Sequence, residues 1–213
     1  MMIFTKVSTT ILAVLLVVGT VGCASSPSID QAQVADANNM LVVDNGPYDE
    51  TKIVKGLDLS NYTGIIVRPV TINYSPERDD FIIPEDSLSE ITGKFTDILV
   101  DEITTNSLRV VEKQGENTLL LEIEITDVAV NVPKDVKRNF NTKVYSKQPV
   151  SMAIEGQLFD SMSNEMLIKF NDKEMSESIT FEEINRVTAG ADMRQLMRRW
   201  STKISQGLSS VAE

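Results

Sequence analysis

Apolar and polar residues alternate with a period of two along three stretches in the second half of the chain. In the longest, Thr118–Val132, the apolar residues point to one side, and polar residues such as Glu122 and Glu124 point to the other. This alternation is typical of a β-strand with one face on a core and one in solvent. Val150–Leu158 and Met166–Phe170 repeat the pattern on either side of a polar turn, which predicts a β-hairpin.

Two other stretches repeat apolar residues every three to four positions, which is the period of an amphipathic α-helix. Ser87–Glu90 is a capping box, in which a hydroxyl and a carboxylate bind free N–H groups of a first helical turn, so we expect a helix to begin there. A second capping box, Thr180–Glu183, predicts a short helix that ends at Gly190, and Asp192 is expected to cap the last helix. The apolar stripes are Leu88, Ile91, Phe95, Ile98, Leu99 and Ile103 in the first long helix and Met193, Leu196, Met197, Trp200, Ile204 and Leu208 in the last.

Shorter strands are expected on both sides of the first helix. Ile65–Ile72 is an apolar run in which Pro69 favours an edge or a bulge, because proline has no N–H to donate. Leu108–Glu112 is the next run. The order of elements predicts an α+β fold: a mostly antiparallel (mixed) sheet of about five strands with two main helices packed on one face. The first helix is expected to connect neighbouring parallel strands.

The start of the chain has a different pattern. Lys6 precedes the short apolar run Ile11–Val18, and small residues follow up to Cys23, which is the layout of a secretory signal peptide. The run is too short to span a bilayer, which takes about 20 apolar residues. A cysteine directly after Gly22 resembles the lipobox of bacterial lipoproteins, which implies acylation of Cys23 and removal of residues 1–22. The alternative is an ordinary signal peptide that happens to precede a cysteine.

The residues after Cys23 lack a regular pattern. Residues 23–60 are mostly polar, small and acidic, which predicts a lipidated flexible tether, followed by a single α+β domain over residues 61–213. Within the tether, Met40–Val43 is apolar, and it alternatively docks on the domain as an edge strand or a short helix.

Composition excludes several functions. A formal net charge of -11 argues against nucleic-acid binding, which requires a basic surface. The chain has no histidine, so Ser-His-Asp catalysis and imidazole metal sites are excluded, and no Ser-x-x-Lys motif is present. Glu122 and Glu124 occupy alternate positions on a polar strand face, and Asp127 and Asp160 have no catalytic spacing. We therefore expect that the protein is not an enzyme and that it binds no cofactor or metal.

The best surface candidate for a partner is a basic segment in this acidic chain. Lys134, Lys137, Arg138 and Lys143 follow the longest predicted strand and offer charge to an anionic lipid head group, a cell-wall polymer or an acidic protein face. The alternative is a solvated loop. Six methionines near the end of the chain suit an apolar ligand or, alternatively, ordinary core packing; they are Met152, Met162, Met166, Met175, Met193 and Met197.

Four segments, in this order after a lipobox, resemble an uncharacterised bacterial lipoprotein family (domain of unknown function 3313). They are Asp58–Val70, Gly115–Val128, Glu155–Glu165 and Ala191–Ile204. At Asn164 the family tends to have glycine, and either residue fits a turn. The resemblance implies an envelope location and an α+β fold, and it implies no activity.

The working hypothesis is an outer-membrane-anchored periplasmic lipoprotein that acts as a non-enzymatic accessory or partner-binding module. Ala24, rather than Asp, follows Cys23, which in well-studied lipoproteins implies transfer to the outer membrane. Its expected partners are the membrane, through the lipid on Cys23, and an envelope protein or polymer. The alternative hypothesis is a carrier of lipid or another apolar ligand.

Overall fold

The alternating and helical patterns become strands and helices in a computed structural model that describes residues 40–73, 85–130, 143–178 and 180–212. The two helices are α1 (Glu85–Asn106) and α2 (Arg186–Ala212). The strands are β1 (Met40–Val42), β2 (Glu50–Val54), β3 (Gly64–Val67), β4 (Thr71–Ile72), β5 (Arg109–Val110), β6 (Thr118–Val130), β7 (Tyr145–Ser146), β8 (Val150–Asp160), β9 (Met166–Met175) and β10 (Glu182–Glu183). All described residues belong to one compact unit.

The main sheet has eight strands, so the prediction of about five was wrong, although the α+β class and the mostly antiparallel pairing are confirmed. Its order is β1-β2-β9-β8-β6-β3-β5, and β4 pairs with β6 beyond the end of β3. The ladders of β3 with β5, β3 with β6, and β4 with β6 are parallel, and the others are antiparallel. The run around Pro69 is divided between β3 and β4, as expected for a residue without an N–H.

The predicted tether is too long at its C-terminal end. β1 and β2 lie within residues 23–60 and form an antiparallel hairpin, in which Met40 is opposite Val54, and β2 adds this hairpin to β9. The sheet therefore begins at Met40 rather than at Asn61, and the alternative of an edge strand is confirmed for Met40–Val42. Strands as short as β1 and β2 have too few residues to show an alternation of apolar and polar positions, so the sequence pattern did not reveal them.

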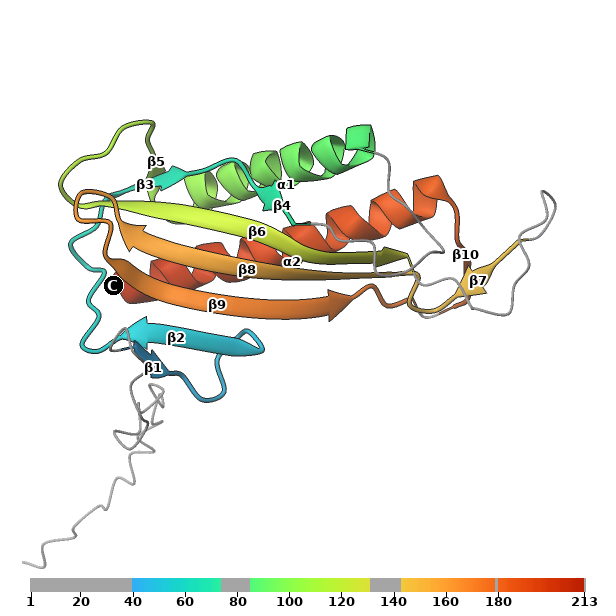
Figure 1. The fold of residues 1–213 in the computed structure, drawn as a ribbon, viewed down its shortest axis with the longest axis horizontal. Helices are drawn as coiled ribbons and strands as arrows, with labels where there is room; N and C mark the ends of the chain where they lie inside the picture. Colours follow the sequence, from blue (N-terminus) through green and yellow to red (C-terminus); the bar gives the residue numbers. More distant parts are fainter. Residues whose placement is uncertain (1–39, 74–84, 131–142, 179, 213) are drawn as a thin grey trace, which may run out of the picture. The chain divides into compact units, whose positions relative to one another are not determined.

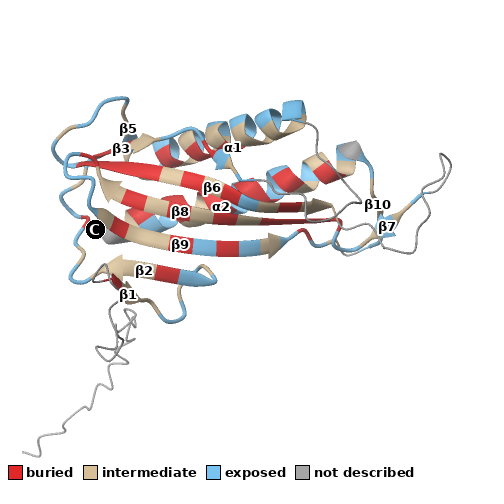
Figure 2. Cartoon of the chain, viewed as in Figure 1, coloured by how far each residue is buried: buried red, intermediate tan, exposed pale blue. Residues whose placement is uncertain are grey.

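The two helices cover one face of the sheet, and within the described residues no helix lies on the other face (Figure 1). Buried residues alternate with partly buried ones along β6 and β8, so that one side of each strand faces the helices (Figure 2). The α2 stripe predicted from the sequence lies in this core, where Trp200 and Leu196 are fully buried. Phe95, Leu99 and Ile103 of α1 are also fully buried. Neither helix has an apolar segment of the length and hydropathy needed to cross a bilayer.

All three predicted helix starts need correction. α1 begins at Glu85, so Ser87 lies inside its first turn. Glu182–Glu183, predicted to open a short helix, instead form strand β10, and Gly190 and Asp192 lie inside α2. α2 is capped by Asn185, whose side-chain oxygen accepts hydrogen bonds from the N–H groups of Val187 (2.9 Å) and Thr188 (3.1 Å).

Close packing at Gly156 positions Phe170 in the middle of β9. Gly156 pairs with Phe170 across the β8–β9 ladder, and a Cβ atom at residue 156 would lie 2.0 Å from Cζ of Phe170. The Phe170 ring therefore lies flat over the glycine. On its other side it stacks with the Tyr48 ring, at a centroid distance of 4.2 Å. This stack joins the segment between β1 and β2 to the core.

Candidate binding surface

Most of the predicted partner-binding residues lie outside the described part of the chain: Cys23, Lys134, Lys137 and Arg138. Lys143 is described, and its Nζ forms an exposed ion pair with Glu183 of β10 at 2.9 Å. The hydrogen bond and charge of Glu183 raise the pKa of Lys143, so the lysine is charged near neutral pH. Lys143 thus joins the start of β7 to β10.

β7 and β10 form a two-stranded ribbon beyond the ends of β8 and β9. Glu183 is paired with Tyr145, and Glu182 with Ser146. Main-chain hydrogen bonds continue the β8–β9 ladder into this ribbon, from Ser176 N to Val150 O (2.8 Å) and from Ser178 N to Lys147 O (2.9 Å). The ribbon therefore continues the β8–β9 hairpin beyond the main sheet.

One face of this ribbon carries aromatic and basic side chains. Because side chains alternate along a strand, residues 143, 145 and 147 share a face, and the pairing places residues 181 and 183 on the same face. The ion pair of Lys143 with Glu183 and the position of Lys147 Nζ, 5.2 Å from the centroid of the Phe181 ring, agree with this arrangement. We call this set the ribbon face; it consists of Lys143, Tyr145, Lys147, Phe181 and Glu183.

Exposed apolar side chains gather at the ribbon. Of the five large hydrophobic residues that are exposed in the described chain, Tyr145 and Phe181 lie on the ribbon, Met175 precedes it, and Val187 follows it. Phe181 is 66% exposed and Val187 is 78% exposed. Only Met162 lies elsewhere, in the turn between β8 and β9. Clusters of exposed apolar residues mark sites of interaction more often than single ones do.

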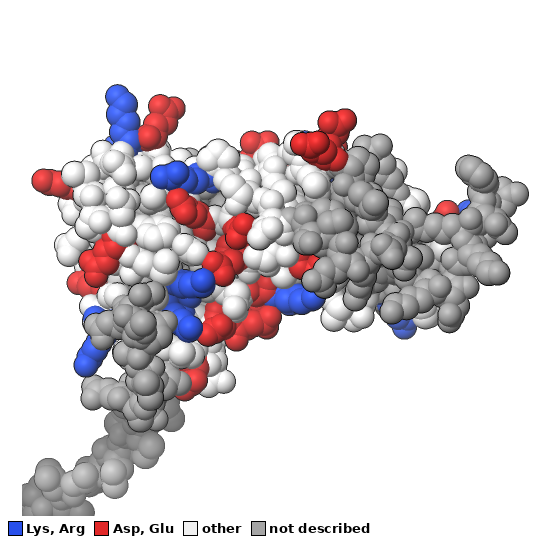
Figure 3. Space-filling view, in the orientation of Figure 1, with Lys and Arg blue, Asp and Glu red and all other residues white. Residues whose placement is uncertain are grey.

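The face of the main sheet opposite the helices is different. Figure 3 shows acidic and basic side chains interleaved over it. Glu122 pairs with Arg68 at 3.0 Å, which confirms the interpretation of this strand face as solvated. Across the same face, Lys169 pairs with Glu155 (2.9 Å) and Lys173 with Asp127 (3.0 Å). These exposed pairs leave little net charge for a partner.

A buried ionic network lies on the helix side of β9. The carboxylate of Asp172, of which 6% is exposed, accepts hydrogen bonds from Trp200 Nε1 (2.8 Å), Lys203 Nζ (3.0 Å) and the main-chain N–H of Asp49 (3.1 Å). Glu174 binds the same Lys203 Nζ at 2.6 Å and the Arg199 Nε at 3.1 Å. We call this group the Asp172 cluster; it consists of Tyr48, Asp49, Asp172, Glu174, Arg199, Trp200 and Lys203.

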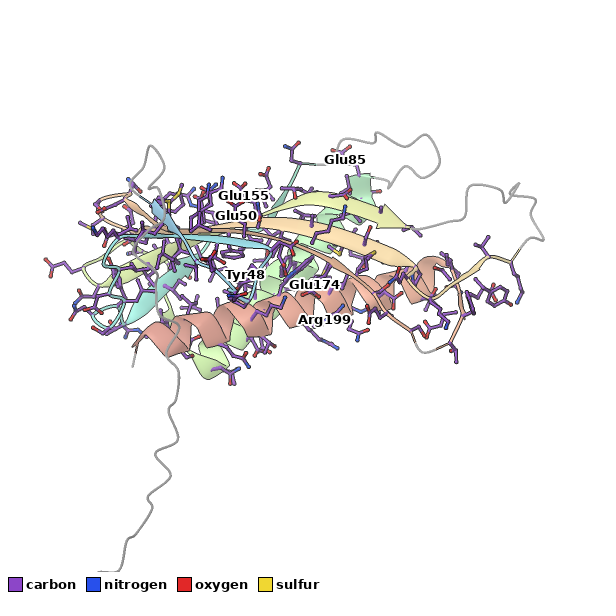
Figure 4. The ribbon with its side chains drawn as sticks, turned by 90° about the horizontal axis from the view of Figure 1, so that it is seen from below. Tyr48, Glu50, Glu85, Glu155, Glu174 and Arg199 are labelled. Atoms are coloured by element: carbon purple, nitrogen blue, oxygen red, sulfur yellow. The ribbon has the colours of Figure 1, made fainter. Side chains whose placement is uncertain are left out.

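Figure 4 shows Tyr48 and Glu174 between the sheet and α2, with Arg199 on the helix, whereas Glu50 and Glu155 lie on the opposite face of the sheet. Burial alone lowers the pKa of Lys203, but its hydrogen bonds to Glu174 and Asp172 outweigh burial and raise it. Burial and the charge of Asp172 raise the pKa of Tyr48. The cluster therefore holds a permanently charged lysine and a neutral tyrosine, and it fastens the segment before β2 to α2.

The other candidates from the sequence have structural partners. Asp160 accepts hydrogen bonds from Tyr62 Oη (2.9 Å) and from the main-chain N–H of Ser163 (2.7 Å), so it holds the turn between β8 and β9 together. Burial and this hydrogen bond raise the pKa of Tyr62 to about 12. Asn164 in the same turn has a φ of 57°, a conformation that asparagine tolerates. Asp127 and Asp160 are not brought together, because Asp127 is opposite Ala153 in the ladder.

The methionines divide between core and surface. Met152, Met193 and Met197 are buried and fill the space between sheet and helices, which is ordinary core packing. Met162 and Met175 are exposed. For the three buried methionines, this division favours core packing over contact with a ligand.

The aromatic part of the ribbon face was not predicted from the sequence. Tyr145 and Phe181 are single aromatic residues in polar surroundings, outside any apolar stripe, and that isolation is the signal that they are exposed. Tyr145 and Phe181 share a face because Tyr145 pairs with Glu183, which is 38 residues away in the sequence. No local sequence pattern predicts such a pairing.

Several solved structures are similar to this chain at low sequence identity. A protein from Xanthomonas campestris, XCC0632, is 8% identical, with a TM-score of 0.45 over 70% of this chain and 85% of that one. A PelC dodecamer from Paraburkholderia phytofirmans is 9% identical, with a TM-score of 0.42 over 75% of this chain and 98% of that one. A minor lipoprotein from Acinetobacter baumannii is 8% identical, with a TM-score of 0.37 over 70% and 94% of the two chains.

No curated protein matches the sequence. A family model does match, over residues 53–204, which include every element from the end of β2 to most of α2, and its description is "Protein of unknown function (DUF3313)". The match covers the four segments that resembled this family in the sequence. The chain therefore belongs to the DUF3313 family.

Proposed function

We propose that the protein is a lipoprotein of the outer membrane that faces the periplasm and acts as a non-enzymatic module, binding a component of the cell envelope through the ribbon face. The observation that carries this proposal is the position of Cys23, directly after a signal-peptide pattern and ahead of a domain of this family. Acyl chains on that cysteine hold the protein at the membrane, because each buried CH₂ contributes about 0.8 kcal/mol.

The ribbon face supports the binding part of the proposal. It gathers exposed aromatic and basic groups, whereas the carboxylates that the sequence offered for catalysis have other roles. Asp127 forms an exposed ion pair with Lys173, and Asp160 holds a turn. These contacts favour a binding module over an enzyme.

Two measurements test the proposal. Mass spectrometry of the N-terminal peptide, after expression in a Gram-negative bacterium, is expected to show acylated Cys23 as the first residue, in the outer-membrane fraction. The Cys23→Ser variant is expected to keep residues 1–22. An unmodified thiol, or a mature chain that begins elsewhere, would overturn the anchor.

Photo-crosslinking in intact cells tests the surface. A photoreactive residue at position 181 is expected to capture an envelope component, and the same residue at position 162, which is equally exposed but lies in the turn between β8 and β9, is expected to capture none. Equal capture at the two positions, or no capture at either, would contradict binding through the ribbon face.

A further inference from the structure

We propose that the partner of the ribbon face is the anionic lipid surface of the membrane that holds the anchor. This inference rests on the proposed function and names the partner of the same surface. The domain would then have two membrane contacts, one through acylated Cys23 and one through the ribbon.

The side chains of the ribbon face suit a lipid surface. Tyrosine is enriched at the level of lipid head groups, and phenylalanine enters the boundary with the acyl chains. Tyr145 and Phe181 are exposed here, and Lys143 and Lys147 share their face. Val187, in the first turn of α2, adds a third exposed apolar group directly after the ribbon.

Charge complementarity favours an anionic surface at this place. The chain carries a net charge of -11, so an anionic membrane repels most of it. The ribbon face has two lysines and one glutamate, and Glu182 lies on the opposite side of the strand, where it accepts a hydrogen bond from Ser178 Oγ at 2.6 Å. Glu182 is thus directed away from the side that bears the lysines, whereas Glu183 pairs with Lys143 on that side, so the two lysines and one glutamate of the ribbon face give it a net charge of +1.

Size favours lipid over a protein partner. A stable protein interface takes about 20–30 residues from each side, or about 800 Å². The ribbon face has five residues; Tyr145 and Glu183 lie in strands of two residues each, and the other three flank these strands. A contact of this size is weak by itself. The lipid anchor strengthens the overall binding, because it keeps the ribbon face at a high local concentration near the membrane surface.

The connection to the anchor is long enough for this contact. The distance along the chain from Cys23 to Met40 is 17 residues (40 − 23), which span at most about 60 Å when fully extended. β1 and β2 lie beside the first half of β9, where Ile53 is opposite Ile168. The seven steps from Ile168 to Met175 cover about 23 Å along the strand, so the ribbon lies within reach of the same membrane.

The test uses the acylated full-length protein in vesicles. The Val187→Cys variant carries a fluorophore on its new thiol. The Met162→Cys variant carries the same fluorophore and is the positional control. Acylated Cys23 has no free thiol, so it does not react with the fluorophore. A quencher attached to lipid is expected to quench position 187 in phosphatidylcholine vesicles that contain phosphatidylglycerol, and to leave position 162 unquenched. Quenching is expected to weaken when salt rises from about 0.1 M to 1 M, because the Debye length falls from about 10 Å to 3 Å.

Charge reversal sharpens the test. Lys143→Glu with Lys147→Glu is expected to lower the contact at least about fivefold, the factor that corresponds to the attraction of one lysine to an anionic leaflet. Lys94→Glu with Lys113→Glu makes the same change at exposed residues of α1 and of the segment after β5, and is expected to have little effect. Unchanged thermal unfolding of both double variants excludes loss of the fold.

The outcomes separate this inference from the proposed anchor. Acylated Cys23 with equal signals at positions 187 and 162 would overturn the lipid contact and keep the anchor. Unmodified Cys23 with quenching at position 187 would overturn the anchor and keep the contact. Capture of an envelope protein at position 181 in cells, together with absent quenching, would replace lipid by a protein partner.

Discussion

The Asp172 cluster and the ribbon face differ in the exposure of their charged and apolar groups. In the cluster, Asp172 is buried and receives three hydrogen bonds from Asp49, Trp200 and Lys203. At the ribbon, Phe181 and Val187 are more than half exposed. In the first arrangement every charge has a partner within the chain, so removal of one partner would leave a buried charge without compensation. The exposed side chains at the ribbon contribute little to the stability of the fold. Such exposed apolar groups suit contact with another surface.

The largest expected effect comes from breaking the cluster. Asp172→Ala removes the acceptor of the fully buried Trp200 N–H and leaves the charge of Lys203 with one carboxylate fewer. We expect the free energy of unfolding to fall by about 3 kcal/mol, as measured by urea denaturation. Asp127→Ala, which breaks an exposed pair with Lys173, is the control and should lower it by less than about 1 kcal/mol. Equal losses would mean that the cluster is no more stabilising than a surface pair.

A smaller loss is expected from disturbing the packing beside the cluster. Gly156→Ala places a methyl group against the Phe170 ring, which Tyr48 holds from its other side. Such overpacking should cost about 1–3 kcal/mol in thermal or urea unfolding. Gly93→Ala, at an open position inside α1, is the matched control and should stabilise by about 0.5–1 kcal/mol. A neutral Gly156→Ala would show that the ring can move freely.

The stability of the fold is expected to depend on pH through Asp192, which lies in α2 between the Asp172 cluster and the ribbon face along the chain. Partial burial and the charge of Glu182 raise the pKa of Asp192 in α2, so the folded state holds its proton more tightly than the unfolded state does. Stability from this group is present below the unfolded pKa, near 3.8, and is lost as pH rises through the higher folded pKa.

Asp192→Asn should therefore be more stable than the parent at pH 7, by less than about 1 kcal/mol because water screens a partly exposed group, and equally stable near pH 3. Urea unfolding at the two pH values measures the difference. A variant that is less stable than the parent at pH 7 would contradict the direction of the shift.

The smallest effect on stability is expected at the ribbon face itself. Phe181→Ser replaces an exposed ring whose neighbour is Lys147, and should change the free energy of unfolding by no more than about 0.5 kcal/mol. The same variant should weaken the lipid quenching at position 187 proposed above. A large loss of stability would instead place Phe181 among the residues that hold the fold.

Local periodicity predicted the parts of the fold that have many residues in one pattern. β6, β8 and β9 follow from alternation, and the buried stripes of α1 and α2 follow from helical spacing. β1, β2 and β10 have two to five residues each, and their pairing energy comes from neighbours that are distant in sequence. The start of α2 was misplaced because Thr180–Glu183 satisfies the capping pattern, while Asn185 forms the cap in the structure.

The two regions differ in how far the sequence predicts them. The Asp172 cluster joins Asp49 to residues 123 positions away, and in β9 alone Asp172 appears as one of several polar residues. Only the fold brings its members together. For the ribbon face, the charge of Lys143 was predicted from the sequence, whereas Tyr145 and Phe181 became candidates only once their exposure was known.

The hairpin of β1 and β2 has a mechanical consequence. Met40 and Val54 lie opposite each other at its open end, so a load that arrives through the residues before Met40 acts across the strands. Hydrogen bonds loaded in this direction give way one after another, at low force. β1 would therefore peel off first and lengthen the connection, while β2 stays fastened through its pairing with β9 and the Asp49 contact. The hairpin is therefore expected to open before the core does when the domain is pulled through the residues before Met40.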